Sequence, residues 1–145
     1  MSERYADDII VLETNIDDST GEMLGYTLER LFNAGAKDAF FTSIYMKKNR
    51  PAYKLTVICD ESLKETMEDI IFSETTAIGI RSRKETRVCL SREIKEIDTR
   101  YGKLKVKTVN NGNGIRLYPE YSSARELAEK FGVPLYDVYS EARKN

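Results

Sequence analysis

Apolar and polar residues show two kinds of pattern along the chain. Apolar residues that alternate with polar ones or form short β-branched runs are typical of strands, and apolar residues that recur every three to four positions are typical of helices. The segments predicted as strands in the first part are rich in β-branched, aromatic and other apolar residues, and polar segments rich in turn-forming residues separate them. The predicted elements of the first part are strands over residues 8–15, 38–46, 53–59 and 78–90, the last as one long strand or two short ones, and helices over 19–35 and 60–72. The order is therefore βαββαβ.

This order predicts an α+β protein with a ferredoxin-like βαββαβ core over residues 6–91. The handedness of such connections gives an antiparallel sheet in the order 4-1-3-2, counting the predicted strands along the chain. Three connections must then meet at one end of the sheet. They are Asn15–Gly21, Lys47–Arg50 and Ser73–Thr76.

Residues 92–145 predict an appended ββαα subdomain. Residues 93–99 and 103–109 form its hairpin, because Leu104, Val106 and Thr108 alternate with three lysines. NNGNG at 110–114 is a flexible loop or tight turn. One helix is expected from Ser122 or Ser123 to Phe131, closed by Gly132, and a last helix from Pro134 to about Ala142.

The ends of the first helix carry their own signals. Gly35 stands where a glycine commonly ends a helix in the left-handed conformation. At the other end we expect Asp18 or Ser19 as the N-cap, and Glu22 completes a capping box with Ser19.

Composition excludes several kinds of chemistry. The 145 residues have a net charge of −1, so no overall field favours nucleic acid or an anionic membrane. Without histidine, a Ser-His-Asp triad and an imidazole metal site are excluded, and a bound metal must take oxygen ligands or a lone thiolate. Cys59 and Cys89 stand alone in apolar segments, which favours structural burial. Neither a bilayer-spanning segment nor a signal sequence is visible, and we expect a cytoplasmic protein.

Each of the three predicted loops carries candidate ligand groups. The first supplies Asp17 and Asp18, which suit a divalent cation; the second supplies three cations, and the third two hydroxyls, which suit phosphate oxygens. The second and third sets are Lys47, Lys48 and Arg50, and Thr75 and Thr76. Simpler interpretations stay open: acidic residues cap helices, and charged hairpin turns are usually solvated. Likewise, Arg81 and Arg83 either extend the anion site or protect an edge strand from aggregation.

Three strings, TNIDD, MKKNRP and ETTAIGIR, are long enough to be specific, and PEY and GVPLYDVY follow them. From about Glu13 to Tyr139, the sequence resembles the C-terminal region of the nickel-insertion protein of the lactate racemase nickel-pincer cofactor pathway. The resemblance implies a cyclometallase, a lyase or metal chelatase that acts on pyridinium-3,5-bisthiocarboxylic acid mononucleotide. It uses CTP with Mg²⁺ or Mn²⁺ to cytidinylylate this substrate and inserts nickel between its sulfur atoms and ring carbon.

In that family the C-terminal region is associated with CTP binding. The family strings imply three sets of residues. Asp17 and Asp18 form a metal-binding pair, and Lys48 and Arg50 are the catalytic residues that stabilise the charge developing during the reaction. The cofactor-binding set is Asn15, Lys47, Lys48, Asn49, Arg50, Thr75, Thr76 and Arg81. The chain lacks the N-terminal region of the full-length form, which we expect to be needed for full activity.

A different class of function stays open: a non-catalytic ferredoxin-like regulatory or oligomerisation module. A homo-oligomer is expected in either case. The expected partners are a nucleotide, the mononucleotide substrate and the N-terminal region of the same enzyme, with neither nucleic acid nor membrane among them. Oligomer number, base specificity and the nickel site do not follow from the sequence.

Overall fold

The structure is a computed structural model that describes residues 3–144. It divides into two compact units: Asp7–Arg87, the core unit, and the described residues on either side of it, the appended unit. The core unit contains most of β1 (Arg4–Ile16) and β4 (Arg81–Leu90), and between them α1 (Gly21–Asn33), β2 (Asp38–Met46), η1 (Lys47–Asn49), β3 (Arg50–Cys59), η2 (Glu61–Leu63) and α2 (Lys64–Glu74). The appended unit contains β5 (Arg92–Thr99), β6 (Gly102–Asn110), β7 (Ile115–Pro119), α3 (Tyr121–Phe131) and α4 (Leu135–Ala142).

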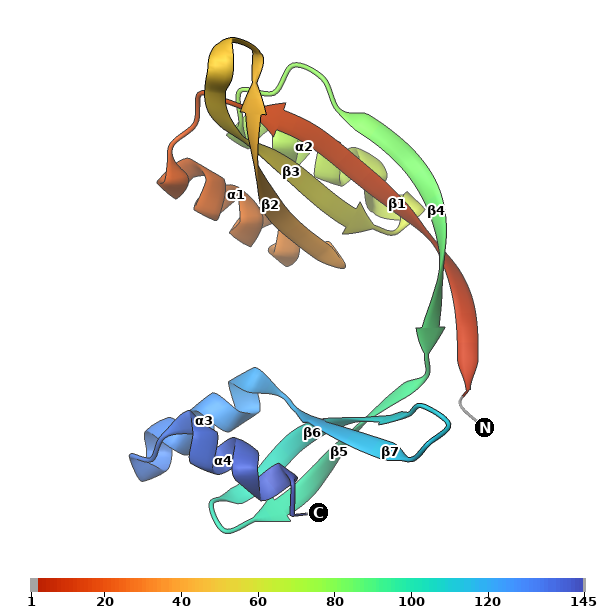
Figure 1. Cartoon of the computed structure of the whole chain (residues 1–145), viewed down its shortest axis with the longest axis vertical. Helices are drawn as coiled ribbons and strands as arrows, with labels where there is room; N and C mark the ends of the chain where they lie inside the picture. Colours follow the sequence, from red (N-terminus) through yellow and green to blue (C-terminus); the bar gives the residue numbers. More distant parts are fainter. Residues whose placement is uncertain (1–2, 145) are drawn as a thin grey trace. The chain divides into compact units, whose positions relative to one another are not determined.

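The sheet of the core unit has the order β2-β3-β1-β4, which confirms the predicted topology (Figure 1). β3 pairs antiparallel with both β1 and β2. Alternate residues of the strands, such as Leu12 and Leu55, pack with Leu31 of α1 and Ile71 of α2 in one buried cluster. Both helices therefore cover the same face of the sheet, and we call the opposite side its open face.

The start of α1 differs from the prediction. Its N-cap is Thr20, whose side chain accepts a hydrogen bond from the Met23 amide at 3.2 Å. Asp18 and Ser19 are not the cap, so the predicted capping box with Glu22 is wrong. Ser19 lies one position before the N-cap, and within residues 3–144 its buried hydroxyl has no hydrogen-bond partner. At the other end, Gly35 follows the helix with φ 101°, as expected.

The connection between β2 and β3 is tighter than a polar loop. β3 begins at Arg50, directly after η1, and Met46 pairs with Arg50 in the ladder. Lys48 and Asn49 both have left-handed backbone conformations, with φ 60° and 57°. Such values are uncommon for residues other than glycine, and they are more costly for lysine than for asparagine.

The appended unit has one strand more than predicted. The sheet order is β5-β6-β7, so the unit is βββαα, and NNGNG is the turn of a second hairpin in which Asn110 pairs with Ile115. No strand was predicted between the loop at 110–114 and the helix expected from Ser122 or Ser123. Tyr118 and Pro119 end β7, an edge strand, where proline is tolerated, and α3 begins at Tyr121 and ends at a left-handed Gly132.

The remaining expectations concern burial. The Cys59 side chain is fully buried, and desolvation followed by the charge of Asp60 raises the pKa of its thiol, consistent with a structural role. Cys89 is half-buried. In the described part of the chain, the helices are too short or too polar to cross a bilayer.

Candidate functional site

The three predicted connections meet at one end of the core sheet. Arg50 Nη1, after the β2–β3 connection, lies 3.5 Å from Asp17 Oδ2, between β1 and α1. The Thr76 hydroxyl, after α2, donates a hydrogen bond to Asp18 Oδ1. Topology alone predicted this meeting, and direct side-chain contacts now join all three segments. We call the surface formed by residues 15–18, 47–50, 75–76 and 81 the three-loop site.

Arg81 connects β4 to this site. Its Nη2 atom donates to Asn15 Oδ1 at 3.1 Å, so two residues from the family strings are in contact across neighbouring strands. The Arg81 side chain is more than half exposed, and its guanidinium keeps other donor groups for a ligand.

The cations of the hairpin are available to a ligand. Lys47 and Lys48 are exposed, and neither has an ion-pair partner among residues 3–144. Among the residues that the structure describes, Arg50 has one ion-pair partner, Asp17 at 3.5 Å, and its side chain is 55% exposed. A pair this open is worth about 1 kcal/mol or less, so a phosphate can displace it.

The two threonines have different roles in the chain. The Thr75 hydroxyl donates to the Ile71 carbonyl at 2.6 Å and accepts from the Ala77 amide at 3.2 Å. It therefore closes α2 and shapes the loop after it. Thr76 is exposed, and its hydroxyl contacts Asp18, so it is the better placed of the two to meet a ligand.

The acids of the site can hold a metal ion only with help. In the part of the chain that the structure describes, no group of three or more histidine, cysteine, aspartate or glutamate side chains is arranged to bind a metal. Asp17 and Asp18 supply two carboxylates. Mg²⁺ is typically held by one or two carboxylates together with phosphate oxygens and water, so this pair fits a metal that arrives with a nucleotide.

A second cluster of charges lies on the open face of the core sheet, and its centre was not predicted. The Glu13 carboxylate lies 3.1 Å from Arg83 Nη1, 3.7 Å from Arg81 Nη2 and 4.0 Å from Lys54 Nζ. Hydrogen bonds from Arg83 to Glu85 and then to Glu13 raise the pKa of its guanidinium. The sequence predicted that Arg81 and Arg83 either extend an anion site or protect an edge strand. Lys54 joins them through the strand register, in which it pairs with Asn15.

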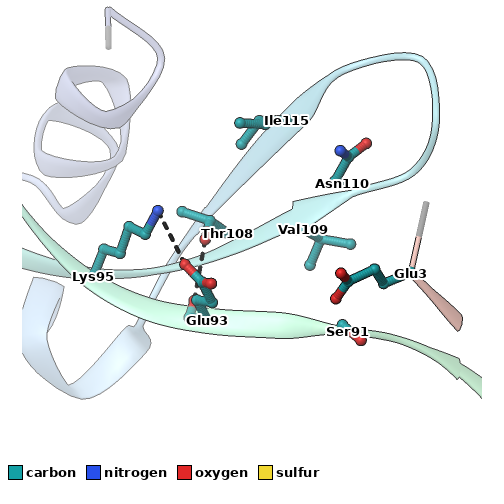
Figure 2. Close-up of a pocket in the computed structure, with 8 residues that line it drawn as sticks. All are labelled: Glu3, Ser91, Glu93, Lys95, Thr108, Val109, Asn110 and Ile115. Carbon is teal, nitrogen blue, oxygen red and sulfur yellow. Dashed lines mark hydrogen bonds and ion pairs between the residues drawn. The ribbon is translucent and has the colours of Figure 1, made fainter. Parts of the chain in front are cut away.

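The appended unit contains a separate cavity of about 300 Å³ (Figure 2). Its lining includes the carboxylates of Glu3 and Glu93 and the ammonium of Lys95, which lies 3.0 Å from Glu93. Thr108 donates to the Glu93 carbonyl at 3.4 Å. Two acids against one base make this cavity unsuited to a triphosphate, and it contains no residue of the predicted site.

The fold and the three-loop site together define a ferredoxin-like domain that presents cations, carboxylates and a hydroxyl at one end of its sheet. The chain belongs to the nickel insertion protein family, whose model matches residues 1–139. It is 52% identical over 134 residues to a pyridinium-3,5-bisthiocarboxylic acid mononucleotide nickel insertion protein of Alkaliphilus metalliredigens, covering 92% of this chain and 32% of the relative. A protein of the same name from Lactiplantibacillus plantarum is 41% identical, with 96% and 33% covered. The chain thus spans about a third of the length of these relatives.

A solved structure agrees with this assignment. The C-terminal domain of a cyclometallase involved in the synthesis of the NPN cofactor of lactate racemase, in its apo form, matches with a TM-score of 0.88 and 40% identity, covering 95% of this chain and 96% of that domain. A protein from Methanopyrus kandleri, 23% identical with a TM-score of 0.64, shares the fold.

Proposed function

We propose that this chain is the CTP- and divalent-metal-binding part of a nickel-inserting cyclometallase that acts on pyridinium-3,5-bisthiocarboxylic acid mononucleotide. The observation that carries the proposal is the meeting of three loops that bear complementary ligand groups, through the contacts of Asp17 with Arg50 and of Asp18 with Thr76. Family membership supports the proposal independently.

The hairpin would bind the phosphates of CTP. Lys47 and Lys48 are exposed and unpaired among the described residues, and Arg50 exchanges its weak contact with Asp17 for phosphate oxygens. Asn49 adds an amide beside them. Lys48 and Arg50 are the cations that would stabilise charge developing on the phosphate oxygens during transfer of the cytidinylyl group.

Polar residues from the other strands and loops would complete the nucleotide site. Arg81 and Asn15, already in contact at 3.1 Å, contribute a cation and an amide, and Thr76 contributes a hydroxyl. Thr75 would act mainly by holding this loop in place, because its hydroxyl is engaged with the α2 carbonyl.

Asp17 and Asp18 would hold Mg²⁺ or Mn²⁺, which neutralises the phosphate charge when bound. The release of Asp17 from Arg50 on nucleotide binding would free a carboxylate oxygen for the ion. One contact in the free protein thus supplies both a metal ligand and a phosphate ligand, and this predicts that metal and nucleotide bind together.

Calorimetric titration of the chain with CTP in the presence of Mg²⁺ tests this proposal. We expect binding that EDTA abolishes, and a loss of affinity of about tenfold or more when Asp17→Ala removes a carboxylate. Lys84→Ala is the control for loss of a charged side chain outside the site, because Lys84 contacts Glu61 at 3.4 Å and no residue of the three-loop site. Failure of a folded sample to bind, or wild-type affinity of the Asp17 variant, would contradict it.

The insertion of nickel requires more than this chain in our proposal. The relatives are about three times as long, and we assign the nickel-handling steps to the region that they carry in addition. Mixing the chain with that region of a relative, the mononucleotide, CTP and Ni²⁺ should restore the nickelated product. Full activity of the chain alone would overturn this division.

A non-catalytic ferredoxin-like module is the second candidate, supported by apolar exposure on the core unit. Tyr45 is 78% and Ile78 is 100% exposed, and both suit the homo-oligomer that we propose with either function. Sedimentation of wild-type, Tyr45→Ser and Ile78→Ser chains tests the oligomer. Dissociation of the variants, combined with an absence of CTP binding to the wild type, would favour the second candidate.

A further inference from the structure

The charge cluster on the open face of the core sheet is not explained by the fold. The Glu13 side chain is only 14% exposed and is surrounded by three cations, but only Arg83 approaches it within hydrogen-bond distance. Arg81 and Lys54 remain at 3.7 and 4.0 Å, so each keeps donors that Glu13 does not satisfy.

The cluster carries a net positive charge. Lys54, Arg81 and Arg83 oppose Glu13 and Glu85, the second of which contacts Arg83 Nε. The side chains of both arginines are about half exposed, at 57% and 49%. Lys84, between Arg83 and Glu85 in sequence, contacts Asp8 and Glu61 instead, so the cations of β4 are divided between the two faces of the sheet.

We propose that Lys54, Arg81 and Arg83 form a second anion site, which binds the phosphate monoester of the pyridinium mononucleotide, and that Glu13 is its resident counter-ion. This inference rests on the proposed function, in which CTP occupies the three-loop site. Glu13 keeps the cations together in the free protein and is displaced from them by the ligand phosphate.

The position of the cluster suits a reaction between two nucleotides. Glu13 and Asn15 are two residues apart on one strand and point to the same face, which places them about 7 Å from each other. Arg81 contacts both, through Glu13 Oε2 and Asn15 Oδ1. A phosphate at the cluster therefore lies beside the three-loop site, where the mononucleotide can meet the bound CTP.

Titration with nicotinic acid mononucleotide, a stable pyridinium mononucleotide, tests this site with and without MgCTP. We expect Arg83→Ala to weaken mononucleotide binding about tenfold or more, because the phosphate loses a charge-assisted hydrogen bond. Glu13→Gln should strengthen it severalfold, because the competing charge is removed while the side-chain size is kept. Lys84→Ala, on the same strand but the other face, should stay within about twofold of wild type.

The outcomes separate this inference from the proposed function. MgCTP binding, measured alone, reports on the three-loop site and should survive Arg83→Ala. Absence of mononucleotide binding, or unchanged binding in the Arg83 and Glu13 variants, would overturn the second site whether or not MgCTP binds. Loss of mononucleotide binding in Lys48→Ala but not in Arg83→Ala would also overturn it, because the ligand would then occupy the three-loop site. Weaker binding in Glu13→Gln would make Glu13 a structural support and overturn its role as a displaced counter-ion.

Discussion

The left-handed backbone of Lys48 allows the charge of the three-loop site to be separated from its conformation. With φ 60° and ψ 28°, Lys48 has a conformation that glycine adopts freely and that other residues rarely adopt. Lys48→Gly removes both the ammonium group and the conformational cost. Lys48→Ala removes the ammonium group with its methylene stem but keeps the Cβ atom and its conformational cost, so comparison of the two variants isolates the backbone contribution.

The expected stabilities of the two variants differ. A residue with a Cβ atom loses ~1–2 kcal/mol in the left-handed region. Glycine avoids this loss but makes the unfolded chain more flexible, which costs ~0.5–1 kcal/mol. The free energy of unfolding of Lys48→Gly should therefore lie between that of the wild type and ~1.5 kcal/mol above it. Lys48→Ala, at an exposed position with the same φ, should stay within ~0.5 kcal/mol of the wild type.

The expected affinities of the two variants agree. A hydrogen bond to a charged group contributes ~1.5–3 kcal/mol, so loss of the ammonium should weaken MgCTP binding roughly 10- to 150-fold in both variants. Urea unfolding at a common m-value measures the stability difference, and calorimetric titration measures the affinity. If Lys48→Gly is clearly less stable than Lys48→Ala, the left-handed backbone argument is refuted. If both bind MgCTP like the wild type, Lys48 does not contact the phosphates.

Three further predictions concern the fold. Thr20→Ala should lower the free energy of unfolding by about 1 kcal/mol, because it removes the N-cap of α1, whereas Ser19→Ala should cause no loss. Equal effects of the two variants in urea unfolding would contradict this cap assignment. Leu31→Ala should cost about 2–5 kcal/mol by the same measurement, since the side chain is fully buried, and a loss below 1 kcal/mol would contradict its place in the core. Arg87 donates to both carboxylate oxygens of Asp7, at 2.7 and 2.9 Å, and holds the pKa of Asp7 below its usual range. The stabilisation by ionised Asp7 is complete above its unfolded pKa of ~4 and is lost as the pH falls through its lowered folded pKa. The free energies of unfolding of wild type and Asp7→Asn should therefore converge in acid. A constant difference down to pH 2 would contradict the assignment.

The parts of the fold that were predicted are those fixed by periodicity over many residues. The apolar run in β1 and the helical spacing in α1 each bury a continuous set of side chains, and Ile10, Leu12, Leu24 and Leu31 all belong to the cluster on one face of the sheet. A short segment carries less of this information. β7 has five residues and ends at Pro119, so its alternation was too brief to outweigh the helix-start signal that follows it.

The N-cap of α1 and the conformation of the β2–β3 turn could not be predicted from the sequence either, because neighbouring residues compete for the same role. Asp18, Ser19 and Thr20 are all suitable caps, and which of them caps α1 depends on where the chain leaves β1 and which donors face it. Similarly, the sequence at Lys48 and Asn49 indicated a polar turn, but ladder pairing of Met46 with Arg50 leaves three residues to reverse the chain, and the closure takes left-handed conformations.

The three-loop site could be predicted from the sequence and the cluster around Glu13 could not, and the difference has a physical reason. The three-loop site lies where elements end, and the order of strands alone brings such ends together, so Asp17, Arg50 and Thr76 could be placed near one another without knowing any register. The cluster around Glu13 lies within strands, where a shift of one residue moves a side chain to the opposite face. Lys54 meets Glu13 because it pairs with Asn15, and Lys84 avoids it by one position in β4. The same dependence makes the second site more sensitive to strand register than the first, so a one-residue insertion within β4 between Arg81 and Arg83 should weaken mononucleotide binding and leave hairpin contacts to MgCTP in place. Equal loss of both ligands in a folded insertion variant would show that the two clusters are one site.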